Sequence, residues 1–348
     1  MNPLILSITV LSLGLGTTMT LIASHWLLIW MGLEINTMAI IPLMIHQHHP
    51  RATEATTKYF LTQASASALL LFAGTTNAWL TGQWNITEII NPTSATLLSI
   101  ALALKIGLAP LHFWLPEVLQ GLTLLTGLIL STWQKLAPFA ILLQLHPLLN
   151  PTLLMTMGIL SIIVGGWGGL NQTQLRKILA YSSIAHIGWM VIILHYSPNL
   201  TLLNLIIYII MTSSLFLLFN MNNTMKINSI AISSTKSPLL TIMTMLTLLS
   251  LGGLPPLTGF MPKWLILQEM TKQNLLVPAT IMALTALLSL FFYLRLCYSI
   301  TLTLSPNPIT SSSSWRTKAF QPNLLSTSTT SFSLLLLPLT PMILSLTT

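Results

Sequence analysis

Apolar runs of roughly 20 residues follow one another along almost the whole 348-residue chain, and each is long enough to cross a bilayer as an α-helix. Only 5% of the residues are charged, and aspartate is absent. Soluble domains carry about 25% charged residues, so this chain cannot cover itself with a water-facing surface. The sequence therefore predicts an all-α polytopic membrane protein, because helices satisfy their own backbone polar groups in lipid.

Apolar length predicts about eleven transmembrane helices, of which the fourth and the ninth are long and broken internally by proline. The predicted spans are 3–23, 25–45, 59–80, 96–120, 122–145, 149–170, 178–196, 200–220, 238–268, 275–297 and 324–346.

Basic residues gather in the loops on one side of the membrane. The loops on the side of the N-terminus hold eight of them, namely Arg51, Lys58, Arg176, Lys177, Lys226, Lys236, Arg316 and Lys318. The opposite loops hold only Lys272. By the positive-inside rule, we expect the N-terminus on the cytoplasmic or matrix side and the C-terminus on the other side.

Cofactor chemistry finds little support in the sequence. The single cysteine, Cys297, excludes intrachain disulfides and cysteine-ligated zinc or iron–sulfur clusters. No glycine-rich nucleotide-binding motif is present. The histidines of HQHHP at 46–50 end a span beside Arg51 and are interpreted as an interfacial cluster, so no metal site is predicted.

Four charged residues and two histidines nevertheless fall inside the predicted spans: Glu34, Lys105, Lys135, Lys263, His112 and His186. A charge at the bilayer centre costs at least ~2.5 kcal/mol on insertion scales. One acid cannot balance three lysines, so at least two lysines are neutral part of the time or face water, as is typical of a proton relay. Buried ion pairs and structural hydrogen bonds are the alternative, and for His186 that alternative is equally good.

Helix breaks accompany two of these lysines. Lys105 is followed by a break in ALKIGLAPLHFWLPEV (103–118), and Lys263 ends the break GGLPPLTGFMPKW (252–264). We assign the breaks to Pro110, Pro255, Pro256 and Pro262. A proline frees a backbone carbonyl, which lipid tolerates only where the carbonyl meets protein or water. Ordinary proline kinks remain the alternative.

The two breaks lie five spans apart, which predicts two repeats of five helices. Because five is odd, the repeats are expected to be inverted relative to each other. We therefore predict a single transmembrane domain over 1–348, with one repeat at about 1–146 and the other at about 149–297. An extramembrane linker at 305–323 and a C-terminal helix at about 324–346 complete it.

Five motifs, in this order, closely resemble the subunit 2 family of mitochondrial NADH–ubiquinone oxidoreductase (complex I), in its vertebrate form. They are MGLEINTMAIIPLM, ALKIGLAPLHFWLPEVLQG, STWQKLAPF, NQTQLRKILAYSSIAHIGWM and SLGGLPPLTGFMPKW. The likeness covers nearly the whole chain and is weaker over 222–238 and 298–348.

The resemblance implies an antiporter-like, proton-translocating subunit of the membrane arm. By the pattern of the family, Glu34 and Lys105 form an acid–lysine pair, Lys135 is the next lysine, His186 is a linking histidine and Lys263 is the terminal lysine. His112 is a further residue that could line the path. The family also has bacterial members with three additional helices at the start.

The resemblance also implies where the remaining chemistry lies. NADH, FMN, iron–sulfur clusters and ubiquinone are expected in other subunits, with no cofactor on this chain. The expected partners are neighbouring antiporter-like and small membrane-arm subunits and phospholipid, including cardiolipin near Arg51 and Lys58, with no nucleic acid. The implied location is the mitochondrial inner membrane, with the N-terminus in the matrix and the C-terminus in the intermembrane space.

Two other functions are compatible with parts of this pattern. A stand-alone cation/proton antiporter would share the lysines, but the sequence offers no second buried acid for a sodium site. A structural scaffold subunit would keep its buried charges as relics, although such charges are costly in lipid.

Overall fold

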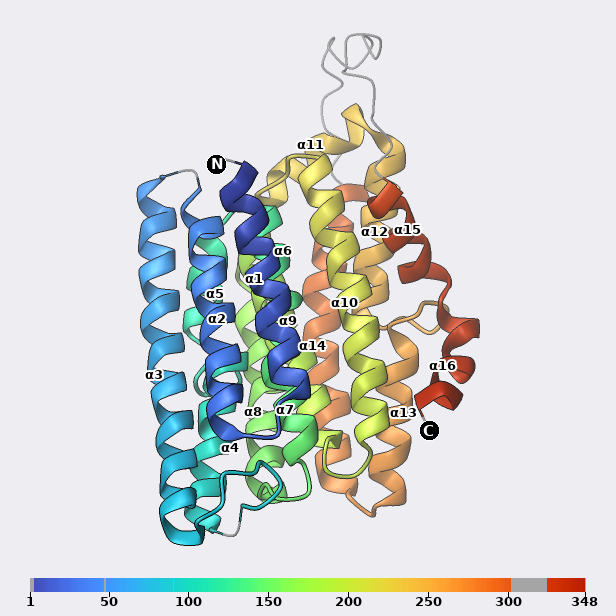
Figure 1. The fold of residues 1–348 in the computed structure, drawn as a ribbon. Helices are drawn as coiled ribbons and strands as arrows, with labels where there is room; N and C mark the ends of the chain where they lie inside the picture. The colour runs from blue at the N-terminus through green and yellow to red at the C-terminus, as the bar shows by residue number, and fades with distance from the viewer. Residues whose placement is uncertain (1–2, 47, 90, 302–323, 348) are drawn as a thin grey trace. The chain divides into compact units, whose positions relative to one another are not determined.

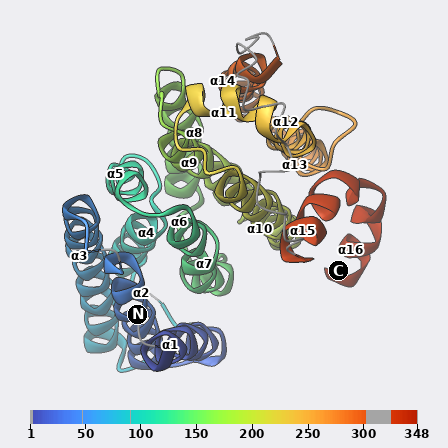
Figure 2. The ribbon, with the colours of Figure 1, turned by 90° about the horizontal axis from the view of Figure 1, so that it is seen from above.

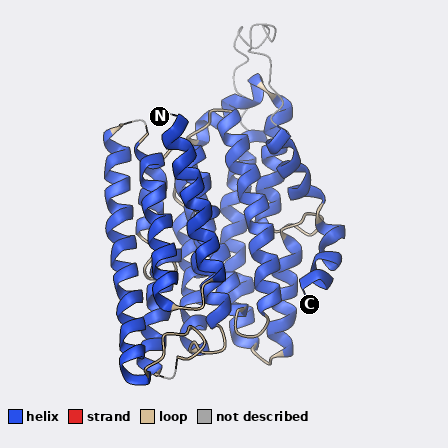
Figure 3. Ribbon diagram, viewed as in Figure 1, coloured by secondary structure: helices blue, strands red, loops and turns tan. Residues whose placement is uncertain are grey.

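A computed structural model describes residues 3–46, 48–89, 91–301 and 324–347. Within these ranges the chain is built from helices joined by short loops, with no β-strand (Figure 3). Six helical segments of the described residues are long and apolar enough to cross a membrane, counting α6 and α7 together as one, as expected for a multi-pass membrane protein. The predicted linker at 305–323, with Arg316 and Lys318, lies outside the described residues.

The helices divide into two compact units. Unit 1 comprises residues 1–161 and 194–198, and unit 2 comprises residues 162–193 and 199–348. The helices that begin in unit 1 are α1 (Pro3–Ile22), α2 (Trp26–Ile45), α3 (Pro50–Thr81), α4 (Pro92–Ile106), α5 (Trp114–Gly121), α6 (Leu124–Ser131), α7 (Trp133–Leu145), α8 (Pro151–Gly169) and α10 (Pro198–Met221). Those that begin in unit 2 are α9 (Leu175–Ile193), α11 (Ile227–Lys236), α12 (Pro238–Gly252), α13 (Phe260–Lys272), α14 (Leu276–Thr301), α15 (Leu324–Leu335), the 3-10 helix η3 (Leu337–Leu339) and α16 (Thr340–Thr347).

In unit 1, α2 packs between α1 and α3, and α3 packs on α4 and α5 (Figure 1). The contact of α1 with α2 depends on two glycines, because a Cβ on Gly16 would collide with Asn36 and one on Gly32 would collide with Thr20. Small residues at a crossing let helix backbones approach closely, which is how membrane helices pack without a hydrophobic driving force.

In unit 2, α9 is the most buried helix: every residue of 178–193 except Tyr181 is buried. It packs against α13 and α14, while α12 packs against α14 and α15. Figure 2 shows the C-terminal helices α15 and α16 beside α12 and α13.

The two predicted proline-broken spans are each divided into two helices. Both α4 and α12 are 15 residues long, begin with a proline in the first turn and end at a left-handed glycine, Gly107 (φ 86°) or Gly253 (φ 81°). Seven residues then separate each from the next helix. Pro110, Pro255 and Pro256 lie in these breaks, whereas Pro262 lies in the first turn of α13, where its missing N–H removes no hydrogen bond.

Several helices differ from the sequence-based prediction. The third helix begins at Pro50 rather than 59, because His49 caps its start by accepting from the Arg51 N–H (3.1 Å). Arg51 and Lys58 are therefore helical and not in a loop. The predicted loop between 220 and 238 contains α11. The continuous helix predicted over 324–346 is wrong: it divides at η3, since Pro338 disfavours helical geometry at Leu337.

Candidate functional site

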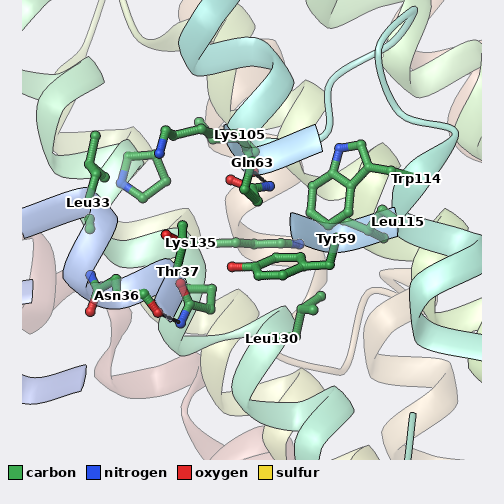
Figure 4. A pocket seen from close by; sticks show the side chains of 14 residues that line it. Leu33, Asn36, Thr37, Tyr59, Gln63, Lys105, Trp114, Leu115, Leu130 and Lys135 are labelled. Atoms are coloured by element: carbon green, nitrogen blue, oxygen red, sulfur yellow. Dashed lines mark hydrogen bonds between the residues drawn. The ribbon is translucent and has the colours of Figure 1, made fainter. Parts of the chain in front are cut away.

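A small cavity of about 20 Å³, roughly the space of one water molecule, lies in unit 1 among α2–α7 (Figure 4). Two of the predicted lysines line it: Lys105, from the last turn of α4, and Lys135, from α7. They are only 6% and 7% exposed. Tyr59 and Gln63 on α3 line the same cavity. Two amines and several neutral hydrogen-bonding groups thus line the same small cavity.

The Lys105 ammonium makes no hydrogen bond and no ion pair with the residues that the structure describes. The charge of Glu34 on α2 nevertheless acts on it. The Glu34 carboxylate accepts from the Thr37 hydroxyl (3.2 Å), one turn further along α2. The predicted acid and lysine are therefore electrostatic neighbours without a direct ion pair.

Three consecutive backbone carbonyls at the end of α4 accept hydrogen bonds from different parts of unit 1. The Ala103 carbonyl accepts from the backbone N–H of Gly107 (2.9 Å). The Leu104 carbonyl accepts from the Trp114 indole (3.0 Å), and the Lys105 carbonyl accepts from the Gln63 amide (3.3 Å). Carbonyls at a helix end otherwise lack partners, which is costly away from water. These bonds fix the break and with it the position of Lys105.

Lys135 is positioned by a second interruption. The span predicted at 122–145 divides into α6 and α7 at Thr132, three residues before Lys135. The Gln134 amide donates to the Asn36 carbonyl (3.1 Å), which ties α7 to α2 across the cavity wall. In Figure 4 the Lys135 side chain lies alongside the ring of Tyr59. Both residues line the cavity.

His112 lies in the break between α4 and α5 and is 4% exposed. Its ring packs on Phe113 (4.3 Å between ring centres), and its Nδ1 has no hydrogen-bond partner among the described residues. It does not belong to the lining of the cavity that holds Lys105. The expected path-lining role of His112 therefore stays a prediction.

Unit 2 contains the other two predicted residues. Lys263, in the first turn of α13, reaches back across the break and donates to the Gly252 carbonyl at the end of α12 (2.9 Å). A cation at the negative end of a helix is electrostatically favoured. A Cβ on Gly253 would lie 3.0 Å from the Lys263 ammonium, so this glycine provides both the left-handed turn and the space.

His186 is 6% exposed on α9, and its ring faces the ring of Tyr208 on α10 (5.7 Å between centres). Because α9 packs against α13, His186 and Lys263 lie on neighbouring helices of the same unit. The structure thus groups the predicted residues by unit, with Glu34, Lys105 and Lys135 in unit 1 and His186 and Lys263 in unit 2.

The residues that hold the breaks, such as Gln63 and Trp114, were not predicted from the sequence. The two breaks also correspond more closely than predicted. GLAPLHFWLPE (107–117) and GLPPLTGFMPK (253–263) share five identities, and each also has an aromatic residue at its eighth position. This alignment places Lys263 opposite Glu117 and Thr258 opposite His112. A direct comparison of the two segments would have found it.

Glu117 differs from Lys263 in its surroundings. Its carboxylate binds the Lys58 ammonium (2.8 Å), which also binds Glu54 (2.7 Å), and the three side chains are between 42% and 63% exposed. This network joins α3 to α5 at the surface of unit 1. The charged residue that follows the first break is therefore exposed, whereas Lys263, which follows the second break, is directed toward the end of α12.

A family model described as "NADH:quinone oxidoreductase/Mrp antiporter, TM" matches residues 23–289, and one described as "NADH dehydrogenase subunit 2 C-terminus" matches residues 290–344. The chain belongs to this family. It is 76% identical to NADH-ubiquinone oxidoreductase chain 2 of Squalus acanthias and 71% identical to that of Scyliorhinus canicula, over all of this chain and of each relative.

Solved structures agree with this family assignment. A chain of respiratory complex I from Thermus thermophilus superposes with a TM-score of 0.86 at 28% identity, covering 97% of this chain and 78% of that one. A chain of the Mrp complex from Dietzia sp. gives a TM-score of 0.82 at 16% identity, covering 97% of this chain and 76% of the other. The second likeness shows the fold alone.

Proposed function

We propose that this chain is a proton-translocating core subunit of the membrane arm of a respiratory NADH:ubiquinone oxidoreductase. The observation that carries the proposal is the cavity of unit 1, where Lys105 and Lys135 are buried together and Lys105 has no direct counter-ion among the described residues. Buried amines of this kind can exchange protons because burial disfavours their charged form. The names of the relatives supply the reaction to which this exchange is coupled.

The proposed path begins at Glu34 and Lys105. While the carboxylate is close, the Lys105 amine keeps its proton; when the contact loosens, the proton moves to Lys135 on the other wall of the cavity. His186 then passes it to Lys263, from which it leaves. The step from Lys135 to His186 joins the two units and rests on the family resemblance. Neighbouring subunits bias the Glu34–Lys105 contact, since a shift in population is how distant chemistry can act here.

Electron transfer is assigned to other subunits. NADH, FMN, iron–sulfur clusters and ubiquinone are proposed to bind there, and this chain supplies buried proton-exchanging groups. Among the described residues, no group of three histidine, cysteine or acidic side chains is arranged to hold a metal ion. Of the histidines at 46–50, His49 is engaged as the cap of α3.

The proposed topology has eleven spans with two inverted repeats, in the mitochondrial inner membrane. The matching breaks, 146 residues apart in sequence, support a repeat of five spans. An odd span count puts the termini on opposite sides, and the basic residues of the loops favour the N-terminus in the matrix and the C-terminus in the intermembrane space. As partners we propose neighbouring antiporter-like and small membrane-arm subunits, and anionic phospholipid such as cardiolipin. Lys58 is a weak candidate for the lipid contact, because two carboxylates already bind it.

Purification from the native membrane in mild detergent tests the assignment. The chain is expected to co-purify with a large assembly that has inhibitor-sensitive NADH:quinone reductase activity. If it instead elutes alone and exchanges cations for protons in liposomes, the complex I function is wrong and the chain is an independent antiporter. If pumping stays normal after each buried lysine is neutralised in turn, the chain is a scaffold.

A further inference from the structure

Thr258 makes a hydrogen bond that sets it apart from most hydroxyls in the helices of this chain. Typical serine and threonine side chains donate to a carbonyl three or four residues earlier in their own helix, as Thr244 donates to the Thr241 carbonyl (2.8 Å). Thr258, in the break between α12 and α13, instead donates to the Ser333 carbonyl of α15 (2.6 Å). Both residues are 1% exposed. The bond therefore links the C-terminal helix to the break that precedes Lys263.

The Ser333 carbonyl is available because α15 ends at Leu335. In a longer helix it would accept from the N–H of Leu337, but that residue begins η3, where Pro338 disfavours a helical continuation. Thr258 thus satisfies a carbonyl that the end of α15 leaves unpaired within the helix. The division of the C-terminal segment at η3 is what makes the bond to Thr258 possible.

The surroundings of this bond are apolar. Met211 from α10 and Phe332 and Leu336 from the C-terminal segment lie around Thr258 and Ser333, with no space for a water molecule between them. A hydroxyl or carbonyl that loses its partner in such surroundings cannot turn to water instead. This hydrogen bond is therefore costly to break, and it holds α15 on the break more strongly than a solvent-exposed hydrogen bond would.

A short path connects Thr258 to Lys263. Gly259 follows Thr258 and packs directly on the Ser250 carbonyl of α12, leaving no space for a Cβ. Helix α13 begins at the next residue, and Lys263 in its first turn reaches back to the Gly252 carbonyl (2.9 Å). A displacement of Thr258 would move Gly259 and the start of α13, and with them the Lys263 ammonium.

We propose that Thr258 is a positioning residue for Lys263, and that α15 holds it through the Ser333 carbonyl. This inference rests on the proposed function, in which Lys263 is the terminal proton-exchanging lysine. It gives the C-terminal helix a defined role, because α15 closes the second break and fixes the distance between Lys263 and the end of α12. The first break is held differently, by Gln63 and Trp114, and carries His112 at the position of Thr258.

The test compares Thr258→Val, which removes the donor with little change in shape, with Thr258→Ser, which keeps it. Thr244→Val is the matched control, since Thr244 is equally buried and its hydroxyl bonds within its own helix. In the assembled complex, Thr258→Val is expected to speed amide hydrogen exchange over residues 253–263 roughly tenfold, the effect of losing one buried hydrogen bond. Protons pumped per electron should fall while the NADH:quinone rate is kept.

Thr258→Ser and Thr244→Val are expected to match the unmodified protein in both measurements. Ser333→Ala, which keeps the carbonyl, is expected to match it as well. If Thr258→Val prevents assembly, Thr258→Cys, with its weaker donor, decides: intermediate exchange supports the proposal, and unchanged exchange overturns it.

Unchanged exchange or unchanged pumping in Thr258→Val would overturn the proposal, and so would a Ser333→Ala variant as defective as Thr258→Val. Failure of the proposed function is recognised separately, because Lys263→Gln would then pump normally whatever the exchange rates are.

Discussion

The Lys105 side chain is buried, but its ammonium group forms no ion pair with the described residues. Its Nζ has no partner among the described residues, and the charge of Glu34 acts on it from α2. A structural lysine in the same place would be expected to form a direct ion pair, because an unpaired buried charge is costly. The lack of that pair is what favours an exchanging role.

Replacing Lys105 with methionine tests this role. Methionine fills a similar volume without a titrating group, so we expect assembly to be retained and proton transfer through the chain to fall by roughly 10²-fold or more. The measurement is pumped protons per electron in proteoliposomes. Lys272→Met is the matched control, since Lys272 is exposed and pairs with Glu269 (3.4 Å). Unchanged pumping in Lys105→Met would rule out the relay.

Gly253 is expected to tolerate no side chain. Gly253→Ala would place a Cβ at φ 81°, at a cost of about 1–2 kcal/mol, and 3.0 Å from the Lys263 ammonium. We expect lower thermal stability of the complex together with weaker pumping. Gly14→Ala is the control, because the helical Gly14 has open space around its Cβ position and alanine there should be neutral or stabilising. Equal melting temperatures for the two variants would contradict this account.

At the scale of helices, the ends of α4 and α12 show how a broken span is made tolerable in lipid. Each left-handed glycine ends its helix, and the freed carbonyls find donors nearby: Trp114 and Gln63 at α4, Lys263 at α12. The break is thus a defined local structure and not a flexible kink. Its geometry decides where Lys105 and Lys263 lie.

The indole of Trp114 is one of these donors and can be removed selectively. Trp114→Phe leaves the Leu104 carbonyl without that donor, and we expect a loss of about 1–3 kcal/mol in stability. Trp79→Phe serves as the control, since Trp79 is 89% exposed and its loss should have little effect. Differential scanning fluorimetry of the purified complex would compare them. A similar shift in both variants would show that the hydrogen bond is not what matters.

Sequence reasoning located the buried lysines and both breaks, because charge and proline are conspicuous in apolar spans. It could not find the partners of the breaks. Gln63 acts on a carbonyl 42 residues away and Thr258 on one 75 residues away, and neither distance leaves a local pattern. The start of α3 was missed because hydropathy falls over RATEATTK although the helix continues, supported by the Glu54–Lys58 pair.

At the scale of the whole chain, the two matching breaks are the clearest internal order. They follow helices of equal length, begin at left-handed glycines and end at corresponding residues 113 and 259. What differs is the charged residue in the first turn after each break: Glu117 is exposed and binds Lys58, whereas Lys263 reaches back to the Gly252 carbonyl. The two breaks thus have the same backbone arrangement, but they are followed by charges of opposite sign and are stabilised by different hydrogen bonds.

The topology gives the last prediction, which concerns the loops on either side of the second broken span. Asn223 and Asn274 are both exposed and both have left-handed backbones, with φ of 50° and 59°. One broken span, α12–α13, separates them, so they should lie on opposite faces of the membrane. Asn223→Cys and Asn274→Cys are therefore a matched pair, and Cys297 gives little background because it is 2% exposed. In sealed mitoplasts, an impermeant maleimide should label position 274 directly, and position 223 only after the membrane is opened. Labelling of both positions from one side would mean that α12–α13 does not cross the membrane, and the eleven-span topology would fail with it.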